Sequence, residues 1–360
     1  MRKRNLWICD TPLQTMNCLN YVYHTRNSDI ENDLCIVGQF MEAQTICTRI
    51  KSKNLFNNVY FLNPDNRGKN ESNLHWYIWR MYSYLFPKKE IEKCMKPCTK
   101  ELIGYDCIWS SVVTCLVAAV LQENKYADFR LFDDGIGSYT GNIIENAIGW
   151  KHRLFSLIFR KGSNRVSPSL LYVNNPNYCN STSAKKIEKL PEWDKDYLNF
   201  ANSIFGYDNT DIAQKIVLLT QPNDSGKSAK KFDVVKYLQQ FSDHVIVRPH
   251  PRDRNLTRYK GFVIDESKCL WEMRIANIDI ENKVLISDFS TAQITPKMLF
   301  DKEPILIFTE YLNQEEKGTI NPESIEMIEN IKKNYRDKKR IIVPKTYGAF
   351  EDIVRSVVSQ

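Results

Sequence analysis

Short β-like runs alternate with helix-length segments along most of this chain, and that alternation constrains the fold more than any single motif does. The runs of the first half cover residues 6–9, 34–37, 59–62, 107–109 and 129–132. Those of the second half cover residues 216–219, 244–247, 262–264, 284–286 and 305–308. Alternating strands and helices are typical of parallel sheets covered by helices. The sequence therefore predicts an α/β protein with two Rossmann-like domains.

The length of 360 residues also suits two domains rather than one ordinary core. A polar, turn-rich segment from about 174 to 206 separates the two series and is interpreted as the inter-domain region. We therefore expect one Rossmann-like domain over residues 1–205 and a second over residues 206–345. Residues 346–360 have helical apolar spacing, and we expect a helix there that packs back on the N-terminal domain.

The composition is that of a soluble globular protein, with 42% hydrophobic and 26% charged residues. The net charge of +7 favours anionic ligands or an anionic membrane surface, unless the basic residues only form a solvated face. No zinc finger, RNA-recognition signature or arginine-rich arm is present, so no nucleic-acid partner is expected. The ten cysteines stand in apolar contexts typical of reduced, buried thiols, and Cys94 and Cys98 lack the second pair of a zinc site.

The N-terminal apolar run ends at Asp10, so it predicts a first strand and not a signal peptide. No stretch reaches the roughly 18 consecutive apolar residues of a membrane span, and we expect a cytoplasmic protein. Two aromatic and basic stretches, 75–86 and 150–161, either lie in a membrane interface or pack in the core or a homodimer contact. The first of these interpretations makes the protein peripheral at the inner face of the plasma membrane.

The first candidate site is Asp133-Asp134-Gly135, which directly follows a strand-like run. Ligands of open α/β sheets bind where strands end. A carboxylate pair there offers a general base, and the second carboxylate orients the base or raises its pKa by like-charge repulsion. The glycine permits a tight turn, although the same three residues also occur in ordinary turns. Thr11, Pro12 and Gln14 follow the first strand-like run in the equivalent position. We assign these three residues and Gly135 to the acceptor side or cleft.

The second candidate site is Arg248-Pro249-His250-Pro251-Arg252, again at the end of a strand-like run. The prolines fix the backbone on both sides of the imidazole. A histidinium here can stabilise the charge on a leaving phosphate, and the arginines extend a phosphate clamp. The alternative is a histidine whose hydrogen bonds are satisfied within the turn.

Two further positions in the second half suit a nucleotide. Ser290 and Thr291 follow the run 284–286, where hydroxyls and backbone N–H groups at a helix start bind phosphate or serve as ordinary N-caps. Glu272 can accept hydrogen bonds from a ribose, or it is a glutamate favoured by the helix dipole. Together the sites suggest group transfer from a phosphate-activated donor in a cleft between the domains. No Gly-x-Gly-x-x-Gly or Walker loop is present, which disfavours a dehydrogenase or P-loop kinase.

The order and spacing of these motifs resemble the bacterial sialyltransferases of glycosyltransferase family 52, the lipooligosaccharide and capsule type. The resemblance spans most of the chain and is carried by Ile8–Gln14, Asp133–Gly135, Leu218–Pro222, His250–Pro251, Glu272 and Ser290–Thr291. It implies a GT-B fold, in which two Rossmann-like domains face a central cleft. The base and the acceptor then belong to the N-terminal domain, and CMP belongs to the C-terminal domain.

By that resemblance, an aspartate of the Asp-Asp-Gly motif is the catalytic base, with Asp133 preferred and Asp134 as its neighbour. His250 is implied to contact the CMP phosphate, and Glu272 to hold the cytidine ribose. Ser290 and Thr291 match a Ser-Ser pair of the family that binds phosphate. The other residues expected on the donor side are Thr220, Gln221, Arg248 and Pro251.

The implied reaction is an inverting transfer of sialic acid from CMP-sialic acid to a hydroxyl, such as that of a terminal galactoside, on capsule or lipooligosaccharide. It needs neither a metal nor a cofactor, and a lipid-linked acceptor fits the membrane interpretation. Two alternatives stay open. One is a GT-B transferase that uses another nucleotide sugar, such as UDP-glucose, and the other is a non-catalytic glycan-binding or membrane-binding protein.

Overall fold

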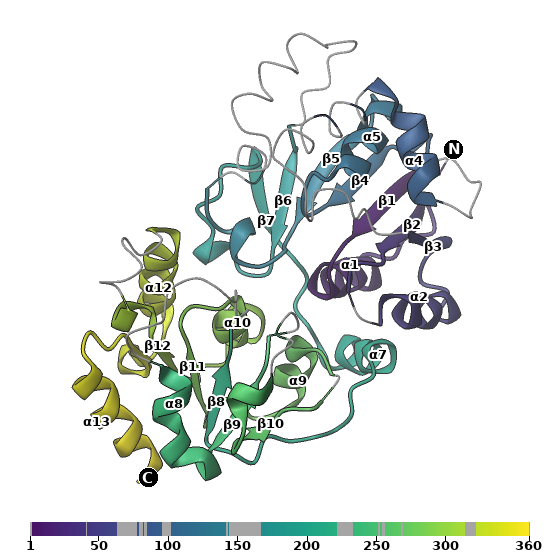
Figure 1. The fold of residues 1–360 in the computed structure, drawn as a ribbon. Helices are drawn as coiled ribbons and strands as arrows, with labels where there is room; N and C mark the ends of the chain where they lie inside the picture. The colour runs from purple at the N-terminus through teal and green to yellow at the C-terminus, as the bar shows by residue number, and fades with distance from the viewer. Residues whose placement is uncertain are drawn as a thin grey trace. The chain divides into compact units, whose positions relative to one another are not determined.

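The computed structural model describes residues 2–40, 42–62, 78, 82, 85–95, 102–141, 143, 167–221, 233–250, 253, 256–267, 269–313 and 322–359. The chain divides into two compact units, Met1–Phe205 and Gly206–Gln360. Each unit consists of a parallel sheet with helices against it (Figure 1). The predicted α/β class with two Rossmann-like units is therefore confirmed.

The first unit alternates strands and helices from its N-terminus. Its strands are β1 (Lys3–Cys9), β2 (Ile30–Val37), β3 (Asn58–Leu62), β4 (Cys107–Ser110), β5 (Asp128–Phe132), β6 (Leu170–Val173) and β7 (Lys186–Lys189). Its helices are α1 (Pro12–His24), α2 (Ala43–Ser52), α4 (Pro87–Met95), α5 (Cys115–Glu123) and α7 (Lys195–Phe205). Along the described part of the unit the strand order is β3-β2-β1-β4-β5-β6-β7, with every pair parallel.

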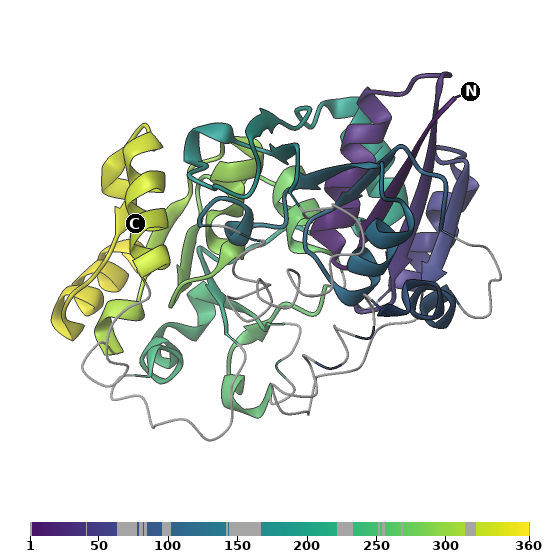
Figure 2. The ribbon, with the colours of Figure 1, turned by 90° about the horizontal axis from the view of Figure 1, so that it is seen from above.

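Helices cover both faces of this first sheet, with α1, α2 and α7 on one face and α4 and α5 on the other (Figures 1 and 2). Aromatic residues fill the space under α1. The rings of Trp7 and Trp109 stack with centroids 4.1 Å apart, and Tyr21, from α1, packs against Trp109 at 4.8 Å. The strands contribute continuous apolar runs because both of their faces are buried.

The second unit repeats the arrangement with shorter strands. They are β8 (Ile216–Leu219), β9 (Val245–Arg248), β10 (Val263–Ile264), β11 (Val284–Ser287), β12 (Ile305–Phe308) and β13 (Ile341–Ile342). The helices are α8 (Val234–Leu238), α9 (Trp271–Asn277), α10 (Thr291–Phe300), α12 (Pro322–Asn334) and α13 (Tyr347–Val358). The described strands pair in the order β10-β9-β8-β11-β12-β13, all parallel.

The closing helix α13 corrects one expectation. It was expected to pack back on the N-terminal domain, but its buried residues Phe350, Val354 and Val357 belong to the core of the second unit. They pack with α8 and with the strands β8, β9 and β11. The apolar face of α13 is thus satisfied within its own unit.

The polar segment after residue 174 corrects a second expectation. The sequence predicts an inter-domain region there, yet the segment contains β7 and α7, and both belong to the first unit. Strand β7 pairs only with β6 at the edge of the described sheet, and its sequence Lys-Ile-Glu-Lys is polar because the edge is half exposed. Helix α7 buries Tyr197, Ala201, Ile204 and Phe205.

Candidate active site

The strand order reverses once in each sheet, between β1 and β4 in the first unit and between β8 and β11 in the second. At such a switch point the loops leave neighbouring strands in opposite directions and open a crevice at the carboxyl ends. Asp10, Asp133 and Asn174 directly follow β1, β5 and β6. Thr220, Pro249 and Asp288 directly follow β8, β9 and β11. Each unit therefore presents polar residues at the carboxyl edge of its sheet, at the switch point or on the strands beyond it.

The carboxylate of Asp133 is buried and accepts hydrogen bonds from four donors. They are the N–H of Gly135 at 2.7 Å, the N–H of Asn174 at 3.1 Å, the amide of Asn174 at 2.9 Å and the hydroxyl of Tyr139. Gly135 has φ +96°, which a side chain would strain, so the glycine is needed for this turn. Burial raises the pKa of Asp133, and the hydrogen bonds oppose that rise. Both carboxylate oxygens are thus used to hold the turn between β5 and β6.

Asp134 has a different setting and is partly exposed. Its Oδ1 accepts a hydrogen bond from the Thr11 hydroxyl at 3.2 Å, and its N–H donates to the Ser138 hydroxyl at 2.8 Å. Burial raises the pKa of Asp134 to about 6, while hydrogen bonds from Gln14 and Thr11 oppose the rise. A carboxylate with this pKa is ionised at neutral pH and is still basic enough to accept a proton in a reaction.

The acceptor-side residues at the end of β1 contact this aspartate or shape the helix start. Thr11 is the N-cap of α1, and its hydroxyl accepts a hydrogen bond from the N–H of Gln14 at 3.2 Å. Pro12 occupies the first turn of α1, as a proline can. The structure therefore brings Thr11, Gln14, Asp134 and Gly135 together at one edge of the first sheet.

Asp10 was not among the predicted site residues, yet it is buried at the same edge, with 7% of its surface exposed. Its N–H donates to the side-chain oxygen of Gln14 at 2.6 Å. The pKa of Asp10 is raised to about 7, first by burial and then by the charge of Asp134. The signal in the sequence was an aspartate directly after the first strand, where the chain turns into a helix.

In the second unit, the turns after β8 and β9 are joined by hydrogen bonds. The N–H of His250 donates to the Thr220 hydroxyl at 2.9 Å, and this bond fixes the backbone that carries the imidazole. The Gln221 amide donates to the carbonyl of Phe289 at 2.7 Å, which ties the end of β8 to the loop after β11. Pro251, also predicted here, lies outside the described residues.

Arg248 was expected to take part in a phosphate clamp, but its guanidinium has protein partners. It pairs with the carboxylate of Asp265, which also binds Arg274, and it donates to the carbonyl of Cys269 at 2.7 Å. It also lies over the ring of Trp271, 5.4 Å from the centroid. These contacts fix the loop that leads into α9, so the guanidinium of Arg248 has a structural role in the second unit.

Helices α9 and α10 bring the remaining predicted donor residues together. The indole N–H of Trp271, at the start of α9, donates to the carbonyl of Ala292 in the first turn of α10 at 2.7 Å. Glu272 is next along α9, and burial raises its pKa while Arg248 opposes the rise. Ser290 is the N-cap of α10, but its side chain makes no capping hydrogen bond. The ordinary N-cap explanation of Ser290 is therefore not supported.

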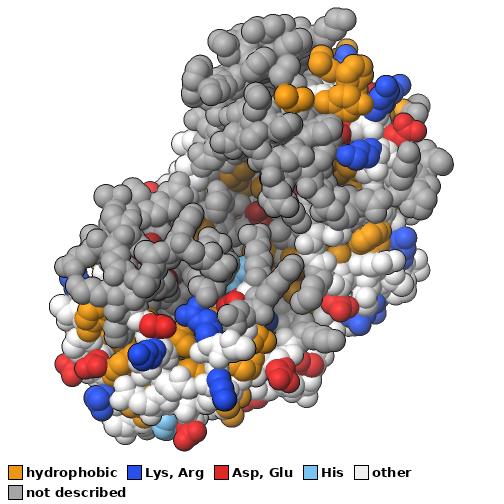
Figure 3. All heavy atoms as spheres, in the orientation of Figure 1, with side chains coloured by type: hydrophobic (Ala, Val, Ile, Leu, Met, Phe, Trp, Pro, Cys, Tyr) orange, Lys and Arg blue, Asp and Glu red, His pale blue; other side chains and the backbone are white. Residues whose placement is uncertain are grey.

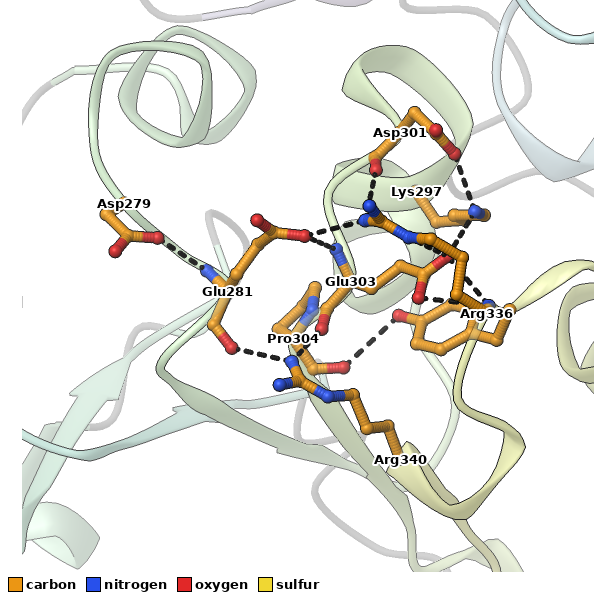
Figure 4. A network of polar contacts seen from close by, with 9 residues as sticks. Asp279, Glu281, Lys297, Asp301, Glu303, Pro304, Arg336 and Arg340 are labelled. Carbon is orange, nitrogen blue, oxygen red and sulfur yellow. Dashed lines mark hydrogen bonds and ion pairs between the residues drawn. The ribbon is translucent and has the colours of Figure 1, made fainter.

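The polar cavity of 350 Å³ at the other edge of the second sheet is a different feature. It is lined by Asp279, Glu281, Asn282, Glu303, Arg336, Asp337 and Arg340, which precede β11, β12 and β13 or lie beside them. In Figure 4 these charges face one another, as in the pairs of Arg336 with Glu281 at 2.9 Å and with Glu303 at 3.2 Å. Lys297 also binds Glu303 (Figure 4). The paired charges indicate a structural network that joins α10, the segment after α12 and the strand starts.

Within the described ranges, no group of three or more His, Cys, Asp or Glu side chains is arranged to hold a metal ion. The helices of the same ranges include none that is long and apolar enough to cross a membrane.

Neither a known protein family nor a curated protein matches this sequence. Solved structures do match it. The calicheamicin glycosyltransferase CalG4 aligns over 100% of this chain and 90% of its own, with a TM-score of 0.52 and 8% identity. The glycosyltransferase of kitacinnamycin aligns over 100% of this chain and 92% of its own, with a TM-score of 0.54 and 7% identity.

The chain has the GT-B fold. At identities of 7% and 8% the similarity concerns the fold alone. One fold can carry different functions, so the activity has to be argued from the residues at the strand ends. In this chain the acidic residues stand at that edge of the first unit, and Thr220, His250 and Ser290 stand at that edge of the second.

Proposed function

We propose that this GT-B protein is an inverting, metal-independent glycosyltransferase that moves sialic acid from CMP-sialic acid to a hydroxyl of a surface glycan. The observation that carries the proposal is Asp134, a partly exposed carboxylate in the turn after β5, which accepts a hydrogen bond from Thr11 at the end of β1 and whose pKa is raised to about 6. The sequence resemblance to the family 52 sialyltransferases supports the donor and the class of acceptor, a terminal galactoside of capsule or lipooligosaccharide.

The four hydrogen bonds to Asp133 support a choice between the two aspartates. A buried carboxylate whose oxygens are already used is poorly placed to receive a proton from an acceptor, so we assign Asp133 to positioning. Asp134 is the base in this proposal. It removes the proton of the acceptor hydroxyl while that oxygen bonds to the anomeric carbon, and the bond from that carbon to the CMP phosphate breaks.

The donor side of the proposal uses the edge of the second unit. His250, with its backbone fixed by Thr220, stabilises the charge that grows on the departing CMP phosphate. The hydroxyls of Ser290 and Thr291 and the start of α10 bind the same phosphate, and Glu272 accepts hydrogen bonds from the ribose. The proposal requires these residues and Asp134 to act on the same pair of substrates.

A test of the donor is a thermal-shift panel with CMP, UDP and GDP. A nucleotide at 100 times its dissociation constant stabilises the folded protein by about 2.7 kcal/mol. CMP is expected to stabilise the protein, and His250→Ala to reduce that effect. Stabilisation by UDP alone would reject CMP and favour a UDP-sugar such as UDP-glucose.

A test of the reaction is product analysis with CMP-sialic acid and a galactoside acceptor, with and without EDTA. The transfer is expected in both, because the proposed mechanism uses no metal. Asp134→Asn is expected to lower the transfer rate by about 10²- to 10⁴-fold while nucleotide affinity stays unchanged. Unchanged turnover in Asp134→Asn would remove this residue from the mechanism.

The proposal includes contact with a membrane that carries the acceptor. In the first unit Ile78, Leu85 and Phe86 are 51%, 49% and 46% exposed, and Lys88 and Lys89 are exposed beside them. Figure 3 shows hydrophobic side chains next to Lys and Arg side chains over the region of α4. Apolar and basic groups together suit an anionic lipid surface. Of 75–86, Tyr82 is also described; the other residues of this stretch, and all of 150–161, lie outside the described residues.

A further inference from the structure

Asp10 has a carboxyl group that the proposed reaction does not yet use. Its side chain is buried at the carboxyl end of β1, and its Oδ2 has no hydrogen-bond partner among the described residues. A buried carboxylate without partners is costly, since burial penalises the charged form. The position therefore favours a carboxyl group that keeps its proton.

Asp10 and Asp134 are connected through α1. The oxygen of the Gln14 side chain accepts the N–H of Asp10 at 2.6 Å, and the same side chain hydrogen-bonds the carboxylate of Asp134. Thr11, adjacent to Asp10, donates to Asp134 at 3.2 Å. After burial, the charge of Asp134 is the second cause that raises the pKa of Asp10.

The groups around Asp10 show what can change its charge. The turn after β5 carries two acidic groups. The charge of Asp134 acts on Asp10, and the charge of Asp133 acts on Asp134. Helix α1 contributes the neutral residues Thr11 and Gln14. The two strands that pair with β1 end in uncharged residues, β2 at Val37 and β4 at Ser110. Asp134 is therefore the charged group to which the ionisation of Asp10 responds.

We propose that Asp10 and Asp134 form an electrostatically coupled carboxyl pair, in which Asp10 is a positioning residue that sets the basicity of Asp134. The effect of this pair on a transfer reaction rests on the proposed function. The more exposed and better hydrogen-bonded Asp134 ionises first, and Asp10 retains the proton. When Asp10 also loses its proton, the second negative charge favours proton uptake by Asp134 and makes it a stronger base.

The pair can be tested without any activity by a carbon-13 NMR titration of the full chain labelled at aspartate carboxyls. The signal that is lost in Asp10→Asn identifies Asp10. In Asp134→Asn the midpoint of the Asp10 titration is expected to fall by about one pH unit or more, the size of interaction that makes two groups titrate as a pair. Asp128→Asn, at the other end of β5, is the matched control and should leave that midpoint in place.

An unchanged Asp10 midpoint in Asp134→Asn would overturn the pair, even if the protein transfers sugar. A shifted midpoint in a protein that transfers no sugar with any nucleotide donor would instead reject the proposed function and leave the pair intact. Near-UV circular dichroism of each variant identifies a substitution that only disturbs folding.

The consequence for the reaction is tested by the pH dependence of the transfer rate. The rate of the natural protein is expected to rise in two steps, and Asp10→Asn should lose the upper step while it keeps the lower one, which belongs to Asp134. Asp10→Glu keeps a carboxyl and should restore the upper step. Two steps in Asp10→Asn would contradict the positioning role.

Discussion

At the scale of single residues, three aspartates at one sheet edge differ in their hydrogen bonds. Asp133 is fully bonded, Asp134 is bonded but accessible, and Asp10 is buried with one oxygen that has no partner in the described part of the chain. Their chemical differences come from the donors that the fold supplies, because the three side chains are identical. The pKa values of Asp134 and Asp10, about 6 and about 7, follow from those surroundings.

The role of Asp133 predicts the effect of removing one of its donors. In Tyr139→Phe one buried carboxylate oxygen loses the phenol hydroxyl, which should cost about 1–3 kcal/mol of unfolding free energy. Tyr126→Phe is the control, since Tyr126 is fully exposed. Urea unfolding at neutral pH measures both. Equal stability of the two variants would show that Tyr139 does not support Asp133.

The raised pKa of Asp10 predicts how stability depends on pH. The folded form holds its proton up to about pH 7, whereas the unfolded form releases it near 3.8, so the folded state loses stability between these values as pH rises. Asp10→Asn removes this loss. The free energy of unfolding of the variant should therefore rise relative to that of the natural protein between pH 4 and pH 8, by at most on the order of 4 kcal/mol. Urea unfolding across this range measures whether the difference in unfolding free energy between the two proteins grows with pH. A difference that stays constant with pH would contradict the prediction.

At the scale of elements, the start of α10 differs from the start of α13, although both have a hydroxyl residue at the N-cap. Ser290 occupies the N-cap without capping, whereas Thr346 caps α13 through a hydrogen bond from the N–H of Ala349 at 3.2 Å. A cap that is not hydrogen-bonded adds little to helix stability. The side chain of Ser290 therefore fits a ligand contact better than a structural one.

This difference predicts opposite results for two similar substitutions. Ser290→Ala should change the unfolding free energy little and should weaken CMP binding. Thr346→Ala should cost about 1 kcal/mol, the usual value of a lost cap, and should leave CMP binding unchanged. Chemical unfolding and calorimetric titration with CMP measure the two quantities. A loss of stability in Ser290→Ala without a change in affinity would assign Ser290 to the helix alone.

At the scale of the whole molecule, the basic net charge of +7 and the exposed apolar residues near α4 support membrane attachment. Leu85→Ser combined with Phe86→Ser should lower binding to vesicles with anionic lipids by about tenfold or more, since each buried side chain contributes about 1.5–3 kcal/mol. Leu256→Ser, at a residue 48% exposed in the second unit, is the control. Vesicle sedimentation measures the binding.

Two outcomes would contradict the membrane surface. Equal sedimentation of both variants would show that Leu85 and Phe86 make no lipid contact. Conversion of a homodimer to a monomer by the double substitution, without any vesicle binding by the natural protein, would assign these residues to a subunit contact.

Much of the fold could be predicted from the sequence because buried parallel strands are short apolar runs with few alternatives. Strands β1 to β5 and β8 to β12 were predicted from such runs. Strands β7 and β13 were not predicted, since β7 is a polar edge strand and β13 has two residues, and the apolar run of β6 was missed. The destination of α13 was predicted wrongly because an amphipathic pattern shows that a face is buried but not against which partner.

The sequence by itself determined the α/β class, the two series of strands and the turns at which acidic, hydroxyl and imidazole groups stand. These features are local, and each follows from residues that are neighbours along the chain. Only the tertiary structure decided the surroundings of the aspartates at this edge, because Asp10, Asp133 and Asn174 come from separate segments. Hydrogen bonding and burial depend on that assembly, and they distinguish an aspartate that holds a turn from one that can accept a proton.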